Sequence, residues 1–230
     1  MHCLIQEMGK EIVRMQSKKP GEREFLVDSK DICDVLENKT GTTNILGISL
    51  NTDEIDEFHI YKDSFNEMRN LRYLDIYSKD SSKCKLEKLW DGTHICKDLG
   101  ILKEIPDLSM ATNLKKLNLY NCSSLLELPS SIQYLNKLKV LLMRGCKDLE
   151  TLPSGINLLS LKRFDLHRCS KLQMFPDIST NISDLDVDET WIKEFPFNMP
   201  LEKLTAFSIC NIKSVISGDT VQVRTKPFPF

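Results

Sequence analysis

A short motif that ends in proline recurs five times between residues 102 and 196, and it constrains the fold more than any other feature. Each copy begins with leucine or isoleucine and places a second large apolar residue directly before the proline. Successive prolines lie 23, 24, 23 and 20 residues apart, at Pro106, Pro129, Pro153, Pro176 and Pro196. A motif that returns at this interval indicates a solenoid of stacked copies of one structural unit.

A second motif lies between the prolines and indicates the secondary structure of each copy. It runs from Leu114 to Cys122 with apolar residues at its first, fourth and sixth positions, and it returns from Leu138, Leu161 and Ile182. Alternation with a period of two predicts a short strand whose apolar residues point inward. This spacing is that of a leucine-rich repeat, so we expect an α/β solenoid with a parallel sheet on its concave side.

The first 42 residues lack the repeat and form a different predicted unit. Apolar residues at helical spacing predict an amphipathic helix over residues 1–17, and residues 25–27 predict a short strand. Asp28 or Ser29 is expected to cap a second helix, which Gly41 closes. A segment this short buries too little apolar surface to fold alone, so we interpret residues 1–42 as the small, mostly helical end of a larger, truncated domain.

The remaining chain is divided by the regularity of its repeats. Residues 43–82 are expected to form the N-terminal entrance of the solenoid, with strands near 45–50, 58–60 and 71–76. Residues 83–210 hold the repeats, of which two near 86–106 are incomplete, and a last strand is expected at 204–209. Residues 211–230 are expected to form an irregular tail without a capping helix.

The charge and cysteine content narrow the expected partners and compartment. With 31 basic and 33 acidic residues, the formal net charge of -2 gives no electrostatic reason to expect nucleic acid or a membrane as partner. The N-terminus does not resemble a secretory signal, and no apolar run reaches the length of about 18 residues that a membrane helix needs. We therefore expect a cytoplasmic location, with the nucleus as a second one, and reduced cysteines.

Three cysteines occupy one repeat position and can be interpreted as metal ligands or as a structural ladder. Cys122, Cys146 and Cys169 each lie eight residues after the first residue of the motif, where Thr190 stands in the next repeat. No histidine accompanies them at the spacing of zinc ligands. A ladder in which each thiol or hydroxyl bonds nearby backbone is therefore favoured, and no metal site is predicted.

The outward positions of the strands supply the candidate binding residues. They form two columns across the predicted sheet, and the charge changes from basic to acidic along its length. We predict that this surface binds a protein, although the same charges are compatible with an ordinary solvated face. The sequence shows no nucleophile motif and no phosphate loop, so no catalytic residue is predicted. The candidate contact residues are Tyr120, Arg144, His167, Asp165, Asp186 and Asp188.

Several longer phrases resemble plant disease-resistance receptors of the TIR-NBS-LRR class. They include Met8-Gly-Lys-Glu-Ile-Val-Arg14, Leu86-Glu-Lys-Leu-Trp-Asp-Gly92 and residues 25–36, 41–50, 105–114 and 175–182, and the likeness covers about residues 1–209. The resemblance implies that residues 1–3 fall on the family's Met-His-Asp motif, at the end of the winged-helix part of a nucleotide switch. There the histidine, which is His2 here, reaches the phosphate of ADP, whereas Cys3 departs from the motif.

The resemblance also implies a function and its partners. The chain is expected to be a non-enzymatic recognition and autoregulatory module that binds a pathogen effector or a host protein. A second expected partner is the receptor's nucleotide-binding domain, in the same or another molecule. No cofactor is expected for this chain, because ADP or ATP belongs to the full-length architecture. Two alternatives are a truncated regulatory or non-functional receptor product and a leucine-rich repeat substrate adaptor of a ubiquitin ligase.

Overall fold

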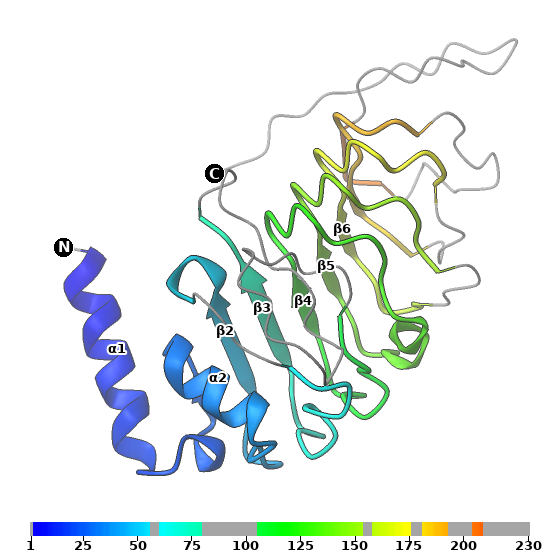
Figure 1. Ribbon diagram of the computed structural model, residues 1–230. Helices are drawn as coiled ribbons and strands as arrows, with labels where there is room; N and C mark the ends of the chain where they lie inside the picture. The colour runs from blue at the N-terminus through cyan, green and yellow to red at the C-terminus, as the bar shows by residue number, and fades with distance from the viewer. Residues whose placement is uncertain are drawn as a thin grey trace, which may run out of the picture.

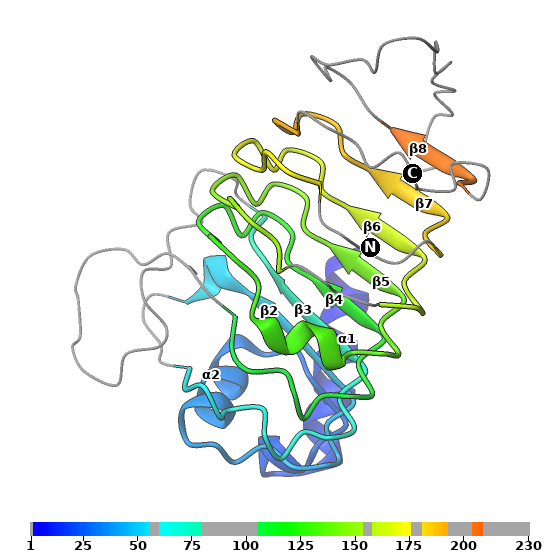
Figure 2. The ribbon, with the colours of Figure 1, turned by 90° about the vertical axis from the view of Figure 1, so that its right-hand side faces the viewer.

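The computed structural model is a solenoid whose eight strands form one parallel sheet (Figures 1 and 2). It describes residues 2–55, 60–79, 105–153, 158–175, 181–192 and 204–208. The strands follow one another across the sheet in chain order, which confirms the predicted leucine-rich repeat fold. Their bounds are β1 Phe25–Leu26, β2 Gly47–Asn51, β3 Tyr73–Tyr77, β4 Lys116–Asn118, β5 Val140–Leu142, β6 Arg163–Asp165, β7 Asp184–Asp186 and β8 Ala206–Ser208.

Inward-pointing residues of neighbouring strands stand in register and form the core. Leu74, Leu117, Leu141, Phe164 and Leu185 are direct partners across β3 to β7, and each is almost fully buried. Because side chains alternate along a strand, the residues on either side of this row point to the opposite face. The repeat pattern therefore fixes which residues reach the exposed face of the sheet.

Two α-helices and a turn of 3₁₀-helix precede β2. Helix α1 spans His2–Gln16, η1 spans Pro20–Glu22 and α2 spans Ser29–Glu37. The Asp28 side chain caps α2 by accepting hydrogen bonds from the backbone N–H groups of Lys30 and Asp31, as predicted. Two further 3₁₀ turns, η2 Thr52–Glu54 and η3 Ser130–Tyr134, lie in the loops of the solenoid.

The predicted end of α2 at Gly41 is wrong. The helix ends at Glu37, and Lys39 adopts a left-handed conformation with a φ of 53° that turns the chain away from the helix axis. Gly41 instead allows a close approach, because a Cβ atom there would lie 2.1 Å from Cε of Met68. A glycine at position 41 therefore allows close packing against Met68 and does not end the helix.

The sheet and the core both cross the predicted boundary between residues 42 and 43. Strand β1 pairs with β2, and Phe25 stands in register with Gly47. Ile32 and Val35 on α2 belong to the same buried cluster as the repeat leucines. Residues 20–42 therefore form the first layer of the solenoid. The other predicted boundaries, residues 58–59 of the strand expected near 58–60 and the tail after 210 lie outside the described residues.

Strand β4 bonds directly to β3 although their partners lie far apart in the sequence. Tyr73 pairs with Lys116, an interval of 43 residues, whereas between 21 and 26 residues separate the partners in the other strand pairs. Residues 80–104, where the incomplete repeats were expected, lie outside the described residues. Despite the long interval, the exposed face of the sheet continues from β2 to β8.

Candidate functional site

The exposed face of the sheet carries the two predicted columns of side chains. The first column follows the strand register through Asp75, Asn118, Leu142, Asp165 and Asp186. The second lies two residues further along each repeat and contains Tyr120, Arg144, His167 and Asp188. Backbone hydrogen bonds between successive repeats continue past the strands and keep this second column aligned.

A left-handed residue follows the second column in four successive repeats. Asn121, Gly145, Arg168 and Glu189 have φ values of 57°, 80°, 63° and 54°. This conformation turns the chain at the same point of each repeat, three residues after the strand ends. Gly145 is also crowded, because a Cβ atom there would lie 2.2 Å from Oδ1 of Asn121.

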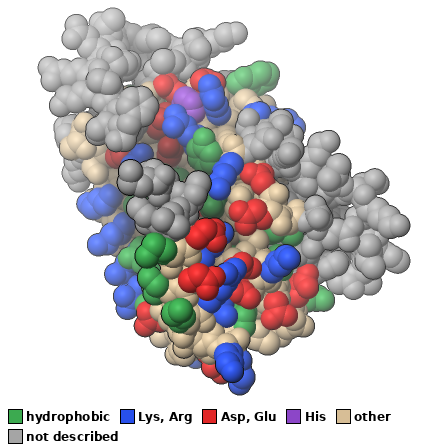
Figure 3. All heavy atoms as spheres, turned by 90° about the vertical axis from the view of Figure 1, so that its left-hand side faces the viewer, with side chains coloured by type: hydrophobic (Ala, Val, Ile, Leu, Met, Phe, Trp, Pro, Cys, Tyr) green, Lys and Arg blue, Asp and Glu red, His purple; other side chains and the backbone are tan. Residues whose placement is uncertain are grey.

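The two columns meet in an acidic cluster around His167 at the C-terminal part of the face. Nδ1 of His167 lies 3.6 Å from Oδ1 of Asp186, and its Nε2 lies 3.6 Å from Oε1 of Glu189. The backbone N–H of His167 donates to Asp165 over 3.0 Å, and that of Asp188 donates to Asp186 over 3.1 Å. Figure 3 shows a face of the molecule on which acidic side chains, in red, and basic side chains, in blue, lie close together.

The six predicted contact residues differ sharply in exposure. Tyr120 is 40% exposed and the side chain of Arg144 is 41% exposed, so both can contact a partner. Asp165 and Asp186 are buried, at 7% and 4%, and offer almost no surface to a protein. Sequence periodicity placed all six on one face, but it could not show that neighbouring columns cover the two aspartates.

Burial has an electrostatic consequence for Asp186. Loss of solvent raises the pKa of its carboxyl group, and the nearby charge of Asp165 raises it further. The hydrogen bond from the backbone of Asp188 and the proximity of His167 oppose this change in pKa without cancelling it. The folded chain therefore holds the ionised form of Asp186 at a cost in free energy.

The cysteines at the shared repeat position form the predicted ladder. The thiols of Cys122, Cys146 and Cys169 are buried, and they donate to carbonyl oxygens of the preceding repeat over 3.5, 3.2 and 3.2 Å. These contacts confirm the structural interpretation. Thr190 differs, because its hydroxyl donates to Val187 within its own repeat over 2.8 Å.

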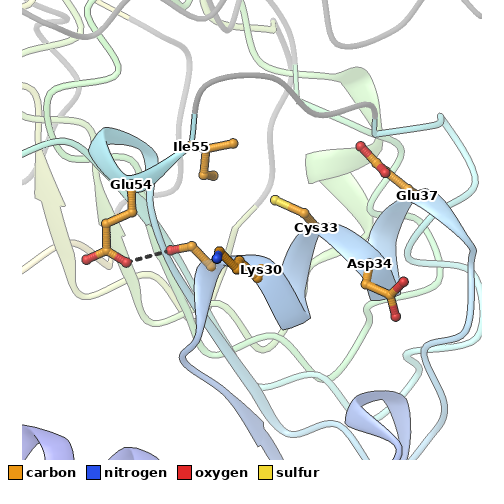
Figure 4. Close-up of a pocket in the computed structure, with 7 residues that line it drawn as sticks. Lys30, Cys33, Asp34, Glu37, Glu54 and Ile55 are labelled. Atoms are coloured by element: carbon orange, nitrogen blue, oxygen red, sulfur yellow. Dashed lines mark hydrogen bonds between the residues drawn. The ribbon is translucent and has the colours of Figure 1, made fainter.

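A second candidate site is a cavity of about 500 Å³ between α2 and η2 (Figure 4). Its lining includes Lys30, Cys33, Glu37 and Glu54, and the hydroxyl of Ser29 donates to Glu54 over 2.9 Å. Burial, followed by the charge of Glu37, raises the pKa of the Cys33 thiol to about 12, so the thiolate needed of a nucleophile is not formed. No sequence motif indicates this cavity, because its walls come from separate elements.

The third candidate region is the N-terminus. His2 is the first residue of α1, but its side chain lies outside the described part of the structure, so its proposed role towards ADP stays a prediction. None of the helices in the described ranges combines the length and apolar character that crossing a membrane requires.

Nearly the whole chain is similar in sequence to known plant proteins. The chain is 48% identical over 281 aligned residues to disease resistance protein RPS6 of Arabidopsis thaliana, a match that covers 98% of the chain. It is 34% identical to disease resistance protein RML1A of the same plant over 94% of the chain. This chain is a relative of plant disease resistance proteins. The match confirms the resemblance to the TIR-NBS-LRR class.

The chain spans about a quarter of the length of these disease resistance relatives, 24% of RPS6 and 27% of RML1A. The aligned region of RPS6 is 281 residues long, which exceeds the 230 residues of the chain, so RPS6 carries residues within it that the chain lacks. No family model matches. Among solved structures, a leucine-rich repeat protein of Leptospira interrogans matches 81% of the chain and 54% of its own length, with 16% identity and a TM-score of 0.37.

Proposed function

We propose that this chain is the recognition and autoregulatory part of an intracellular plant immune receptor. The observation that carries the proposal is the identity of 48% to a disease resistance protein across 98% of the chain. In this role the chain is not an enzyme. It binds a pathogen effector or a host protein through the exposed face of its sheet, in the cytoplasm and also in the nucleus.

The exposed part of the face has the chemistry of a protein-binding surface. Tyr120 and Arg144 stand in the same column on neighbouring repeats, and both are accessible. Tyrosine and arginine are the residue types that most often dominate binding energy, since they combine a large contact area with specific hydrogen bonds. The acidic cluster beside them supplies charge complementarity, which favours a partner with basic groups at that end.

The N-terminal layer, residues 20–42, provides a structural basis for the proposed autoregulation. Strand β1 belongs to the same sheet as the repeats, and α2 contributes to the same core, so a domain attached to this layer is held at a fixed place relative to the face. We propose that the receptor's nucleotide-binding domain, in the same or another molecule, docks there, with His2 facing the bound ADP. The isolated chain should then give no heat when titrated with ADP, and micromolar binding would contradict this assignment.

Affinity measurements with matched variants test the proposed face. A partner is first identified by quantitative pull-down from infected and uninfected leaf tissue, and its dissociation constant is then measured with purified proteins. We expect the double variant Tyr120→Ala, Arg144→Ala to bind at least about 30-fold more weakly, since each residue of this kind contributes about 1–2 kcal/mol or more. Tyr134→Ala is the control, because Tyr134 is 53% exposed but lies in η3 outside the sheet.

Two results would overturn the face assignment. One is a double variant that binds the partner with wild-type affinity. The other is a control variant at Tyr134 that weakens binding as much as the double variant does. Circular dichroism of all three proteins establishes that any loss reflects the surface and not the fold.

A further inference from the structure

We propose that His167, Asp186 and Asp188 bind a divalent transition-metal ion on the exposed face of the sheet. This inference does not depend on the proposed function. The three residues come from two neighbouring repeats, with His167 after β6, Asp186 at the end of β7 and Asp188 two residues beyond it. The solenoid therefore brings together ligands that lie about 20 residues apart in the sequence.

The separations fit one ion. One ligand atom from each residue lies within 4.8 Å of the other two, and Nδ1 of His167 is 3.6 Å from Oδ1 of Asp186. Metal bonds of about 2.0–2.2 Å to nitrogen and oxygen place neighbouring ligand atoms roughly 3–3.5 Å apart in a tetrahedral site. Small rotations of the side chains would bring the ligand atoms to these distances.

Two of the ligand atoms are buried without a hydrogen-bond partner. Among the described residues, Nδ1 of His167 and Oδ1 of Asp188 have none, and the separation of 3.6 Å from Asp186 is too long to supply one. A buried polar atom without a partner destabilises the folded state, and a bound cation would remove both penalties. The side chain of Asp186 is itself only 6% exposed, which distinguishes this cluster from a solvated acidic patch.

The local charges favour a cation. Asp165, Asp186 and Asp188 lie around His167, whereas Glu189 faces Nε2 of His167 and is itself paired with Arg168 over 3.0 Å. The only guanidinium recorded against Asp186 in the described structure is that of Arg144, at 4.0 Å. One guanidinium at that distance does not balance the three aspartates. A divalent ion compensates the carboxylates more completely and bonds all three side chains.

The donor set selects the class of metal. One imidazole nitrogen and two carboxylate oxygens suit Zn²⁺ or Mn²⁺, whereas Mg²⁺ and Ca²⁺ prefer oxygen ligands alone. The supporting contacts hold the ligands in place, because the Ser208 hydroxyl donates to Oδ2 of Asp188 and Nε2 of His167 faces Glu189. With three protein ligands, at least one coordination position stays open for water or for a side chain of a binding partner.

Calorimetric titration of the full chain with Zn²⁺, in a buffer that contains excess Mg²⁺, tests the site. We expect one strong site in the wild-type chain and at least a tenfold loss of affinity in His167→Ala and in Asp188→Asn. Asp184→Asn is the matched control, since it removes the same charge from the same repeat while its carboxylate pairs with Arg163 outside the cluster. That variant should bind Zn²⁺ close to wild-type affinity.

The absorption spectrum of the Co²⁺ form separates this site from binding by cysteine. A spectrum without thiolate charge-transfer bands is expected, and it should disappear in Asp188→Asn, whose shape-conserving change leaves the fold intact. Absence of a Zn²⁺ site, thiolate bands, or wild-type affinity in both ligand variants would each overturn the proposal. Circular dichroism of each variant without metal verifies that a loss of binding is not a loss of structure.

Discussion

A buried carboxylate on the exposed face is the clearest departure from what repeat position alone predicts. Asp186 occupies an outward position of its strand, yet neighbouring columns cover it and raise the pKa of its carboxyl group. A group whose pKa is raised on folding binds protons more tightly in the folded state. Its ionised form therefore opposes folding above that pKa, and the penalty fades as the pH falls through it.

We predict that Asp186→Asn raises the free energy of unfolding of the metal-free chain at neutral pH, by less than about 1 kcal/mol. The amide oxygen can still accept the hydrogen bond from the backbone of Asp188. Urea unfolding in the presence of a chelator, at pH 7 and again near pH 4, measures the difference. The gain should shrink at the lower pH, and a destabilised variant at pH 7 would contradict the account.

Gly145 provides a second prediction at the scale of one residue. Gly145→Ala should lower the free energy of unfolding by about 1–2 kcal/mol or more, because its φ of 80° is unfavourable for alanine and the new Cβ would meet Asn121. Gly9→Ala is the control, since Gly9 lies within α1 with no atom near its Cβ position. Denaturant titration should show that the control is neutral or slightly stabilising. Equal effects of the two changes would be evidence against the left-handed turn.

At the scale of elements, α2 depends on its N-terminal cap. Burial alone would raise the pKa of Asp28, but the hydrogen bonds from Arg14 and from the backbone of Asp31 and Lys30 outweigh it and lower the pKa. The stabilisation is therefore present at neutral pH and is lost as the pH falls through the folded-state pKa.

Asp28→Ala should lower the free energy of unfolding by about 0.5–2 kcal/mol at pH 7, since it removes the cap. Asp28→Asn keeps an oxygen in the capping position and should lose only the smaller contribution of the charge. Comparison of the two variants by thermal unfolding at pH 7 and near pH 3 separates cap from charge. If both variants were equally destabilised at pH 7, the backbone hydrogen bonds would not be the source of the effect.

The elements differ in how far the sequence predicts them. Strands β4 to β8 follow from the repeat, because every inward position is a large apolar residue. The end of α2 did not follow, because Lys39 adopts a left-handed conformation that glycine more often occupies and Gly41 is used for packing. The cluster at His167 could not be predicted from the sequence either. The two columns were predicted, but the burial of the side chains and their unpaired atoms depend on how adjacent repeats cover each other.

For the whole molecule, continuity of the sheet is the property from which the other conclusions follow. The face that carries Tyr120, Arg144 and the His167 cluster is one surface only if the repeats stack without a break. That condition is least obvious between β3 and β4, where 43 residues separate paired positions. The N-terminal layer, residues 20–42, joins the face through the pairing of β1 with β2 and of β2 with β3.

Nuclear Overhauser contacts between the backbones of paired strands test this continuity most directly. We predict contacts between Leu74 and Leu117, which pair across β3 and β4, as strong as those between Leu117 and Leu141 across β4 and β5. Strand neighbours about 4.8 Å apart bring these backbone protons within range. A spectrum that shows the β4–β5 contacts but none between β3 and β4 would contradict the continuous solenoid.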